Sequence, residues 1–157
     1  MKKLLILAVS LFLVASCSST NNSGVTNDSA SKTAIKYGAT GSDAGQAGEL
    51  KTVNFDFDKA ALSAEAKTIL QKNTEWLKKN PKVKIQIEGH CDSRGTIEYN
   101  IALGEKRASI VKKYISALGI KADRINTISY GEERPLDAAD TEEAWAKNRR
   151  ANFVLVN

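Results

Sequence analysis

The sequence predicts an α/β fold, a two-layer sandwich in which helices cover a mixed sheet of about four strands. Residues 50–157 alternate short segments of period-two hydrophobicity with longer segments of helical periodicity, in the order βαβαβ, a short helix, then β. The final segment, residues 151–156, carries apolar side chains on both faces, which is typical of a strand in the interior of a sheet.

The first strand and the first helix are expected between residues 52 and 80. Three apolar residues alternate with polar ones over residues 52–58, which predicts a strand. Ser63 is a suitable N-cap for the helix that follows, and Asn80-Pro81 should end it. The predicted buried stripe of this helix comprises Ala66, Ile69, Leu70, Asn73 and Leu77.

The second half of the domain repeats the alternation. Residues 83–89 predict a strand, and Thr96 can cap a long helix that ends at Gly119. Residues 125–130 predict a third strand, and a short helix is expected over residues 141–147. The predicted buried stripe of the long helix comprises Ile97, Ile101, Ala108, Val111, Ile115 and Leu118.

Residues 1–16 have the features of a secretory signal peptide. Two lysines precede an apolar run of about 11 residues, whereas a membrane-spanning helix needs roughly 20. Small residues then lead directly to Cys17, a pattern that resembles the bacterial lipobox. We therefore expect cleavage before Cys17 and acylation of that residue, with a secretory signal and a chance cysteine as the alternative. Ser18 in the next position favours sorting to the outer membrane.

Residues 17–49 are expected to form a lipidated cysteine followed by a flexible linker. Of the 32 residues from Ser18 to Glu49, 18 are Ser, Thr, Asn or Gly. Apolar side chains are too sparse there to offset the entropy lost when a chain becomes ordered. The sequence thus predicts an acylated end, a tether, and a folded domain at residues 50–157.

The predicted domain is only mildly basic. Residues 50–157 hold 19 Lys and Arg against 15 Asp and Glu, a net charge of +4, and the two signs are interspersed. Because neither a basic stripe nor an aromatic ladder is present, nucleic acid is not an expected partner. Once Cys17 is acylated, Cys91 is the single free thiol, so an intramolecular disulfide is excluded.

The junction between the second strand and the long helix, EGHCDSRG at residues 88–95, concentrates reactive side chains. A Cys91 nucleophile with a His90 base is disfavoured, because neighbours in an extended chain point to opposite faces. One His, one Cys and scattered carboxylates also lack the spacing of a known metal site. We therefore expect no enzymatic activity, no metal and no cofactor. His90 is expected to hydrogen-bond the backbone, and Cys91 to pack as a small apolar residue.

A pocket for a charged ligand fits this junction better. Asp92 follows a strand, where side chains are delivered to a crevice. Asn100, Leu103 and Arg107 share one helix face, offset from the predicted apolar stripe. Aspartate beside arginine matches a zwitterion that carries an ammonium and a carboxylate. Backbone N–H groups of residues 93–96 can add donors for an anion. The alternative is that Asp92 and Arg107 merely pair with each other.

Four stretches of the domain carry a family resemblance: FDFD at 55–58, IEGHCDSRGTIEYNIALGEKRA at 87–108, SYGEERP at 129–135 and KNRRANFVL at 147–155. Together they resemble the peptidoglycan-associated lipoproteins and, more broadly, the OmpA-like peptidoglycan-binding domain that flagellar stator subunits share. The resemblance spans essentially all of the domain, and the lipobox and linker agree with it.

The resemblance implies non-covalent binding of the stem peptide of the cell wall through its meso-diaminopimelate residue. Carried over by position, Asp92 and Arg107 are the principal contacts, Asn100 and Leu103 shape the pocket wall, and Asp58 is a further candidate. Asn148-Arg149-Arg150 also matches the family. One of these arginines is expected to pair with an acidic neighbour and brace the pocket, and direct ligand contact is the alternative.

The same resemblance implies a place in the Tol–Pal system of the cell envelope. The partners would be peptidoglycan, the outer membrane through the acyl chains on Cys17, TolB, and TolA as a second Tol candidate. The protein would tether the outer membrane to the wall and help it follow the wall during division. Two rival hypotheses are a wall-binding lipoprotein with no link to Tol proteins and a cell-wall hydrolase.

Overall fold

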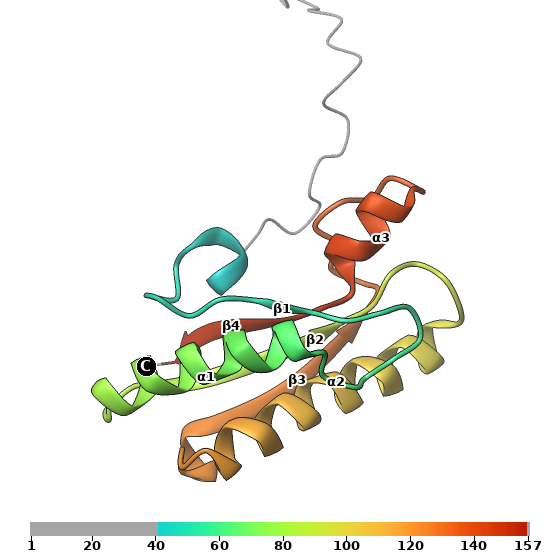
Figure 1. Cartoon of the computed structure of the whole chain (residues 1–157). Coiled ribbons are helices and arrows are strands. Elements are labelled where there is room, and N and C mark those ends of the chain that lie inside the picture. The colour runs from blue at the N-terminus through green and yellow to red at the C-terminus, as the bar shows by residue number, and fades with distance from the viewer. Residues whose placement is uncertain (1–40, 157) are drawn as a thin grey trace, which may run out of the picture. The chain divides into compact units, whose positions relative to one another are not determined.

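The computed structural model describes residues 41–156. The predicted signal peptide, Cys17 and the linker up to residue 40 lie outside the described residues. The helices and strands follow the predicted order (Figure 1), with bounds β1 Val53–Asn54, α1 Ala64–Lys79, β2 Lys84–His90, α2 Ile97–Ala117, β3 Ile125–Gly131, α3 Glu142–Asn148 and β4 Arg150–Val156. Within residues 41–156, no helix combines the length and apolarity needed to cross a membrane.

The four strands form one mixed sheet in the order β1-β4-β2-β3. β2 pairs parallel with β3 and antiparallel with β4, and β1 pairs antiparallel with β4. The predicted mixed sheet is confirmed, and so is the interior position of the last strand.

The helices α1 and α2 lie across one face of the sheet, while α3 lies at the end of the sheet where β4 begins (Figure 1). One apolar core joins the two long helices to the strands, and its largest fully buried members include Leu70, Leu77, Ile85, Ile87, Val111, Ile115, Ile125 and Phe153. This packing fixes the start of α2 beside the end of β2.

Side-chain caps begin the three α-helices where the sequence predicts. The hydroxyls of Ser63 and Thr96 accept hydrogen bonds from the N–H groups of Ala66 and Tyr99, at 3.0 and 3.2 Å. The predicted N-caps are confirmed, and Thr141 caps α3 in the same way. Such caps satisfy N–H groups that a helix start otherwise leaves unpaired.

The buried stripe of α2 differs from the prediction at its N-terminal half. Ile97 is 54% exposed and Ile101 is 37% exposed. The buried face instead continues through Asn100, Leu103 and Arg107. The prediction was wrong here because polar residues were left out of the buried stripe, whereas the side chains of Asn100 and Arg107 find buried hydrogen-bond partners and Leu103 lies between them in the sequence.

The first strand is much shorter than the predicted span of residues 52–58. Beyond Asn54 the backbone is satisfied chiefly by arginine side chains. The Phe55 carbonyl accepts a bond from Arg149 Nε at 3.0 Å, and the Asp56 carbonyl accepts one from Arg107 Nη2 at 3.1 Å. Because these carbonyls bond to arginine side chains and not to a neighbouring strand, the predicted end of the strand is a loop.

The segment 41–49 was assigned to the flexible linker, but the structure orders it. Gly41–Ala44 form a short 3₁₀ helix, and Ala47 is 1% exposed. Ser42 Oγ donates to Asn152 Oδ1 on β4 at 2.8 Å. The composition, rich in Ser and Gly, gave no indication of these tertiary contacts, and residues 41–49 belong to the folded domain.

Two glycines allow α2 to approach β2 backbone to backbone. A Cβ atom added to Gly89 would collide with the carbonyl oxygen of Gly104, and one added to Gly104 would collide with Ser129 Oγ and the Gly89 carbonyl. Ser129 Oγ is itself held by the Ile101 carbonyl at 2.7 Å. The close approach brings the middle of α2 against the end of β2.

Substituting Gly104→Ala should therefore destabilise the domain. In an exposed helix this change would stabilise by about 1 kcal/mol, but overpacking in a tight contact costs roughly 1–3 kcal/mol. We expect a lower free energy of unfolding in urea. The control Glu105→Ala lies on the exposed face of α2 and should change this energy by less than about 0.5 kcal/mol. An unchanged or more stable Gly104→Ala variant would contradict the close packing.

Candidate functional site

A pocket of about 230 Å³ lies where the end of β2, the start of α2 and the loop after β1 meet. It is smaller than the roughly 300–1,000 Å³ of pockets that hold drug-sized ligands, and its size suits one amino-acid residue. All five residues predicted to bind ligand line it, and its full lining is Phe57, Asp58, Cys91, Asp92, Arg94, Gly95, Tyr99, Asn100, Leu103 and Arg107.

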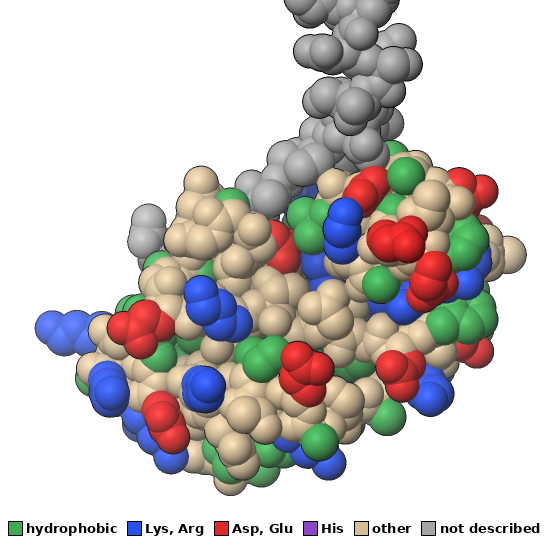
Figure 2. All heavy atoms as spheres, turned by 45° about the horizontal axis from the view of Figure 1, so that its top comes forward, with side chains coloured by type: hydrophobic (Ala, Val, Ile, Leu, Met, Phe, Trp, Pro, Cys, Tyr) green, Lys and Arg blue, Asp and Glu red, His purple; other side chains and the backbone are tan. Residues whose placement is uncertain are grey.

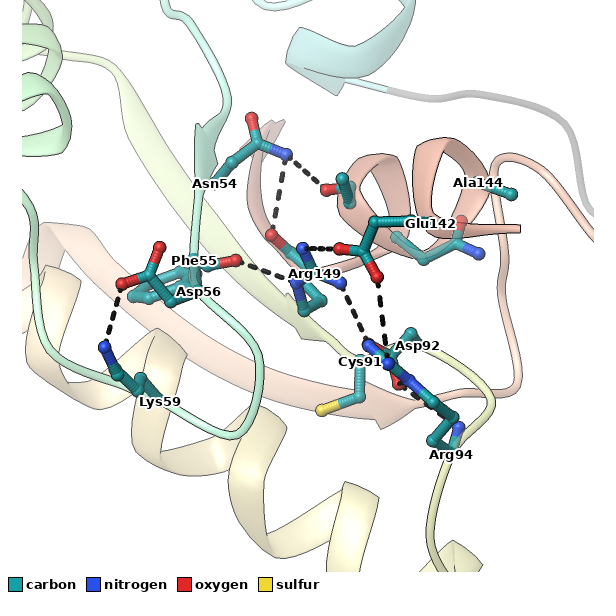
Figure 3. Close-up of polar contacts among 12 residues, drawn as sticks. Asn54, Phe55, Asp56, Lys59, Cys91, Asp92, Arg94, Glu142, Ala144 and Arg149 are labelled. Carbon is teal, nitrogen blue, oxygen red and sulfur yellow. Dashed lines mark hydrogen bonds and ion pairs between the residues drawn. The ribbon is translucent and has the colours of Figure 1, made fainter. Parts of the chain in front are cut away.

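Asp92 is 4% exposed and is surrounded by arginine (Figure 3). Arg94 Nη2 donates to Oδ2 at 2.7 Å, and Arg149 Nη1 donates to the same oxygen at 3.3 Å. Burial alone would raise the pKa of Asp92, but the hydrogen bonds from these two arginines lower it. The carboxylate is therefore ionised at neutral pH. The Arg94 backbone N–H also bonds to Asp92, so it is not the free anion donor that was expected.

Arg107 is fully buried and is bonded to backbone carbonyls. Its Nε donates to the Lys59 carbonyl at 2.9 Å, and its Nη1 donates to the His90 carbonyl at 2.8 Å. Burial lowers its pKa from the usual value. Asp92 and Arg107 thus have separate partners, and the alternative that they simply pair with each other is wrong.

Asn100 and Leu103 belong to α2, as Arg107 does, and line the same pocket. The Asn100 side chain is 2% exposed and donates to the backbone carbonyls of Asp92 and Arg94, at 3.2 and 3.1 Å. It therefore holds the loop that carries Asp92 against the helix. Leu103 is 9% exposed and supplies an apolar part of the lining.

Asp58 lies at the mouth of the pocket, in a left-handed backbone conformation with φ of 55°. Aspartate tolerates this region better than most residues. Its carboxylate accepts a hydrogen bond from the Tyr99 hydroxyl, and this bond raises the pKa of Tyr99. The contact links the loop after β1 to the first turn of α2.

The sequence analysis missed the side chains of Phe57, Arg94 and Tyr99, which line the pocket, and that of Trp145, which contacts Arg94. The Arg94 guanidinium lies 3.9 Å from the centre of the Phe57 ring and 4.1 Å from that of Trp145. Such cation–π contacts are favourable, most of all with tryptophan. The position of Arg94, two residues after Asp92, was the one sequence signal for this contact.

Arg149 has the bracing role that the sequence predicted for one arginine of the 148–150 run. It donates to Asp92, to Glu142 Oε1 at 2.8 Å and to the Phe55 carbonyl (Figure 3). It therefore ties α3 and the end of β1 to the pocket. Arg150 pairs instead with Asp43 at 2.7 Å, away from the pocket lining.

His90 and Cys91 have different surroundings. Cys91 Sγ lies in the pocket wall, 3.3 Å from the Asn100 carbonyl. The His90 ring stacks on Tyr130, and neither ring nitrogen has a hydrogen-bond partner among the described residues, so the expected backbone bond is wrong. Burial lowers the pKa of His90, which keeps the ring neutral. Residues 41–156 contain no cluster of three or more His, Cys, Asp or Glu placed to hold a metal ion.

A family model described as the OmpA family matches residues 54–149. The chain belongs to the OmpA family. A peptidoglycan-associated lipoprotein from Haemophilus influenzae is 41% identical over 149 residues, which cover 95% of this chain and 94% of that protein. One from Brucella melitensis is 45% identical over 101 residues, and the match covers 64% of this chain and 60% of that protein.

Solved structures agree with this assignment. The crystal structure of the peptidoglycan-associated lipoprotein from Burkholderia pseudomallei has a TM-score of 0.65 and 40% identity, and the match covers 67% of this chain and 89% of that one. The C-terminal domain of Helicobacter pylori MotB has a TM-score of 0.64 at 22% identity, covers 68% and 84% of the two chains, and supports the fold alone. The predicted family and fold are confirmed.

The Cys91 thiol should react slowly in the folded protein. Burial raises the pKa of Cys91 to about 11. The thiolate fraction near pH 8 should therefore be lower by about 100-fold than for an ordinary cysteine, because each pKa unit is a factor of ten. Labelling with a chromogenic disulfide should be slow in buffer and fast in urea. In the Cys91→Ala variant, any remaining labelling occurs at Cys17, which makes this variant the control. Equal labelling rates for the folded and unfolded protein would contradict the burial of Cys91.

Proposed function

We propose that the domain binds peptidoglycan without a covalent bond, by taking the meso-diaminopimelate residue of the stem peptide into this pocket. The observation that carries the proposal is that one small cavity is lined by an ionised carboxylate, Asp92, and by a buried guanidinium, Arg107, which do not neutralise each other. A carboxylate attracts the ammonium of an amino acid, and a guanidinium attracts its carboxylate.

The remaining lining residues suit the same ligand. Leu103 offers apolar contact to the methylene carbons of diaminopimelate, while Asn100 fixes the loop of Asp92. Asp58, bonded to the Tyr99 hydroxyl, adds a second carboxylate at the mouth of the pocket. The names of the relatives from Haemophilus, Brucella and Burkholderia, all peptidoglycan-associated lipoproteins, support this class of ligand.

Binding is better supported than catalysis. A hydrolase of the wall would need a nucleophile or a general acid and base poised near neutral pH. The described pocket offers a Cys91 thiol with a pKa of about 11 and an Asp92 carboxylate whose pKa is lowered by two arginines. The thiol is scarcely ionised at neutral pH and is therefore a poor nucleophile, while the arginine-bonded carboxylate is a weak base that carries no proton to donate.

The wider role that we propose is a tether between the outer membrane and the cell wall. Cys17, once acylated, would anchor the chain in the membrane, and the folded domain would hold the wall from the periplasm. Several acyl chains bind a bilayer far more strongly than one. We place the protein in the Tol–Pal system, with TolB as the partner and TolA as a second candidate. In that role it would support the integrity of the outer membrane and its invagination during cell division. A wall-binding lipoprotein without Tol partners remains the rival hypothesis.

Wall binding should depend on the charge of Asp92. Replacing Asp92→Asn keeps the shape of the side chain and removes its charge, so the dissociation constant for purified peptidoglycan should rise by about 10–100-fold. Co-sedimentation with wall sacculi measures this change. The matched control is Asp123→Asn, an exposed aspartate in the turn before β3, which should bind like the unmodified protein.

Arg107→Lys provides the complementary test, since it retains a positive charge but loses the planar guanidinium. It should weaken wall binding, and urea unfolding of each variant separates this loss from loss of fold. Undiminished sedimentation of folded Asp92→Asn and Arg107→Lys proteins would move the binding site elsewhere. Release of soluble wall fragments would favour the hydrolase.

A further inference from the structure

Arg94 occupies the position that the ammonium group of a ligand needs. Its Nη2 and Nε donate to the two Asp92 oxygens at 2.7 and 3.2 Å (Figure 3). Asp92 itself is 4% exposed. A cation from outside therefore reaches this carboxylate only when the Arg94 side chain moves away.

Arg94 is held in a way that permits such movement. Its side chain is 31% exposed, against 8% for Arg149, and its guanidinium lies over the Phe57 and Trp145 rings. Arg149 is anchored to the Phe55 carbonyl, and Arg107 to the carbonyls of three residues. The bond of Arg94 to Asp92 is bidentate and strong, but another cation can replace it at the carboxylate, whereas the buried arginines are bonded to backbone carbonyls and are costly to disturb.

Moving Arg94 alone is unfavourable, because its guanidinium loses the carboxylate that pairs with it. A ligand offsets this loss only if it brings an anion to the same place. The α-carboxylate of an amino acid lies one carbon away from its ammonium, so a zwitterion exchanges one ion pair for two. The ammonium takes Asp92, and the carboxylate is shared by the released Arg94 and by Arg107, one oxygen to each.

Building on the proposed function, we propose that Arg94 is a specificity-determining residue, a displaceable counter-cation that makes the pocket select a zwitterionic side chain over a purely cationic one. A stem peptide with lysine in place of diaminopimelate brings an ammonium without a carboxylate. It would displace Arg94 from Asp92 and bring no anion in return, so the only carboxylate in contact with the guanidinium would be the exposed Glu142, now 3.7 Å away. Discrimination then arises from a penalty on the wrong ligand as well as from attraction to the right one.

The test compares two synthetic tripeptides, L-Ala-γ-D-Glu-meso-diaminopimelate and L-Ala-γ-D-Glu-L-Lys, by isothermal titration of the full chain. The original protein should prefer the diaminopimelate peptide. In Arg94→Ala the lysine peptide should bind more tightly and the diaminopimelate peptide no more tightly, so that the ratio of the two affinities falls by about tenfold or more. Arg94→Lys, which keeps the charge, should retain part of the preference.

The control is Lys106→Ala, which removes an exposed cation on α2 outside the lining of this pocket. It should leave both affinities, and therefore their ratio, nearly unchanged. An unaltered ratio in Arg94→Ala, with diaminopimelate still bound, would overturn the role of Arg94 and leave the proposed function standing. Failure of the original protein to bind either peptide would overturn both.

Discussion

The burial of the Arg107 guanidinium is the constraint on which the site depends. This side chain donates to carbonyls of Asp56, Lys59 and His90, so it joins the loop after β1, the end of β2 and the middle of α2. A buried charge is tolerated only where hydrogen bonds replace its lost water. Here backbone dipoles supply the replacement, and the close approach of Gly89 and Gly104 puts the helix within reach. The loop after β1 keeps its shape, and the pocket its wall, because backbone carbonyls replace the water that the buried Arg107 has lost.

The same choice of partners leaves Asp92 to Arg94 and Arg149, and only Arg94 of these two is partly exposed. If Arg107 bonded to the carboxylate, the two charges would cancel in an internal ion pair, and the pocket would have little attraction for a zwitterion. Figure 2 shows acidic and basic side chains mixed over the face that it displays, in keeping with the interspersed charges of the sequence. Because no broad field of one sign dominates that face, the proposed selectivity has to come from the few groups that meet in the pocket.

The sequence predicted the order of the elements, the helix caps, the mixed sheet and the pocket residues from Asp58 to Arg107, because these follow from local periodicity and from the family pattern. It did not predict which partners those residues take. Ile97 and Ile101 have helical spacing yet are exposed, while polar Asn100 and Arg107 are buried, since the hydrogen bonds that solvate them come from distant segments. Composition likewise placed residues 41–49 in the linker, although contacts with β4, more than 100 positions later, order them.

Arg149 explains why the site does not depend on Arg94 for its integrity. Asp92, Arg94, Glu142 and Arg149 form a ring of two acids and two arginines, in which each arginine contacts both acids. Arg149 is buried and also holds the Phe55 carbonyl, so it remains in place whichever cation occupies the outer position. When Arg94 leaves, both carboxylates still contact Arg149. The inner arginine therefore preserves the shape of the site, and the outer one is free to be exchanged for a ligand.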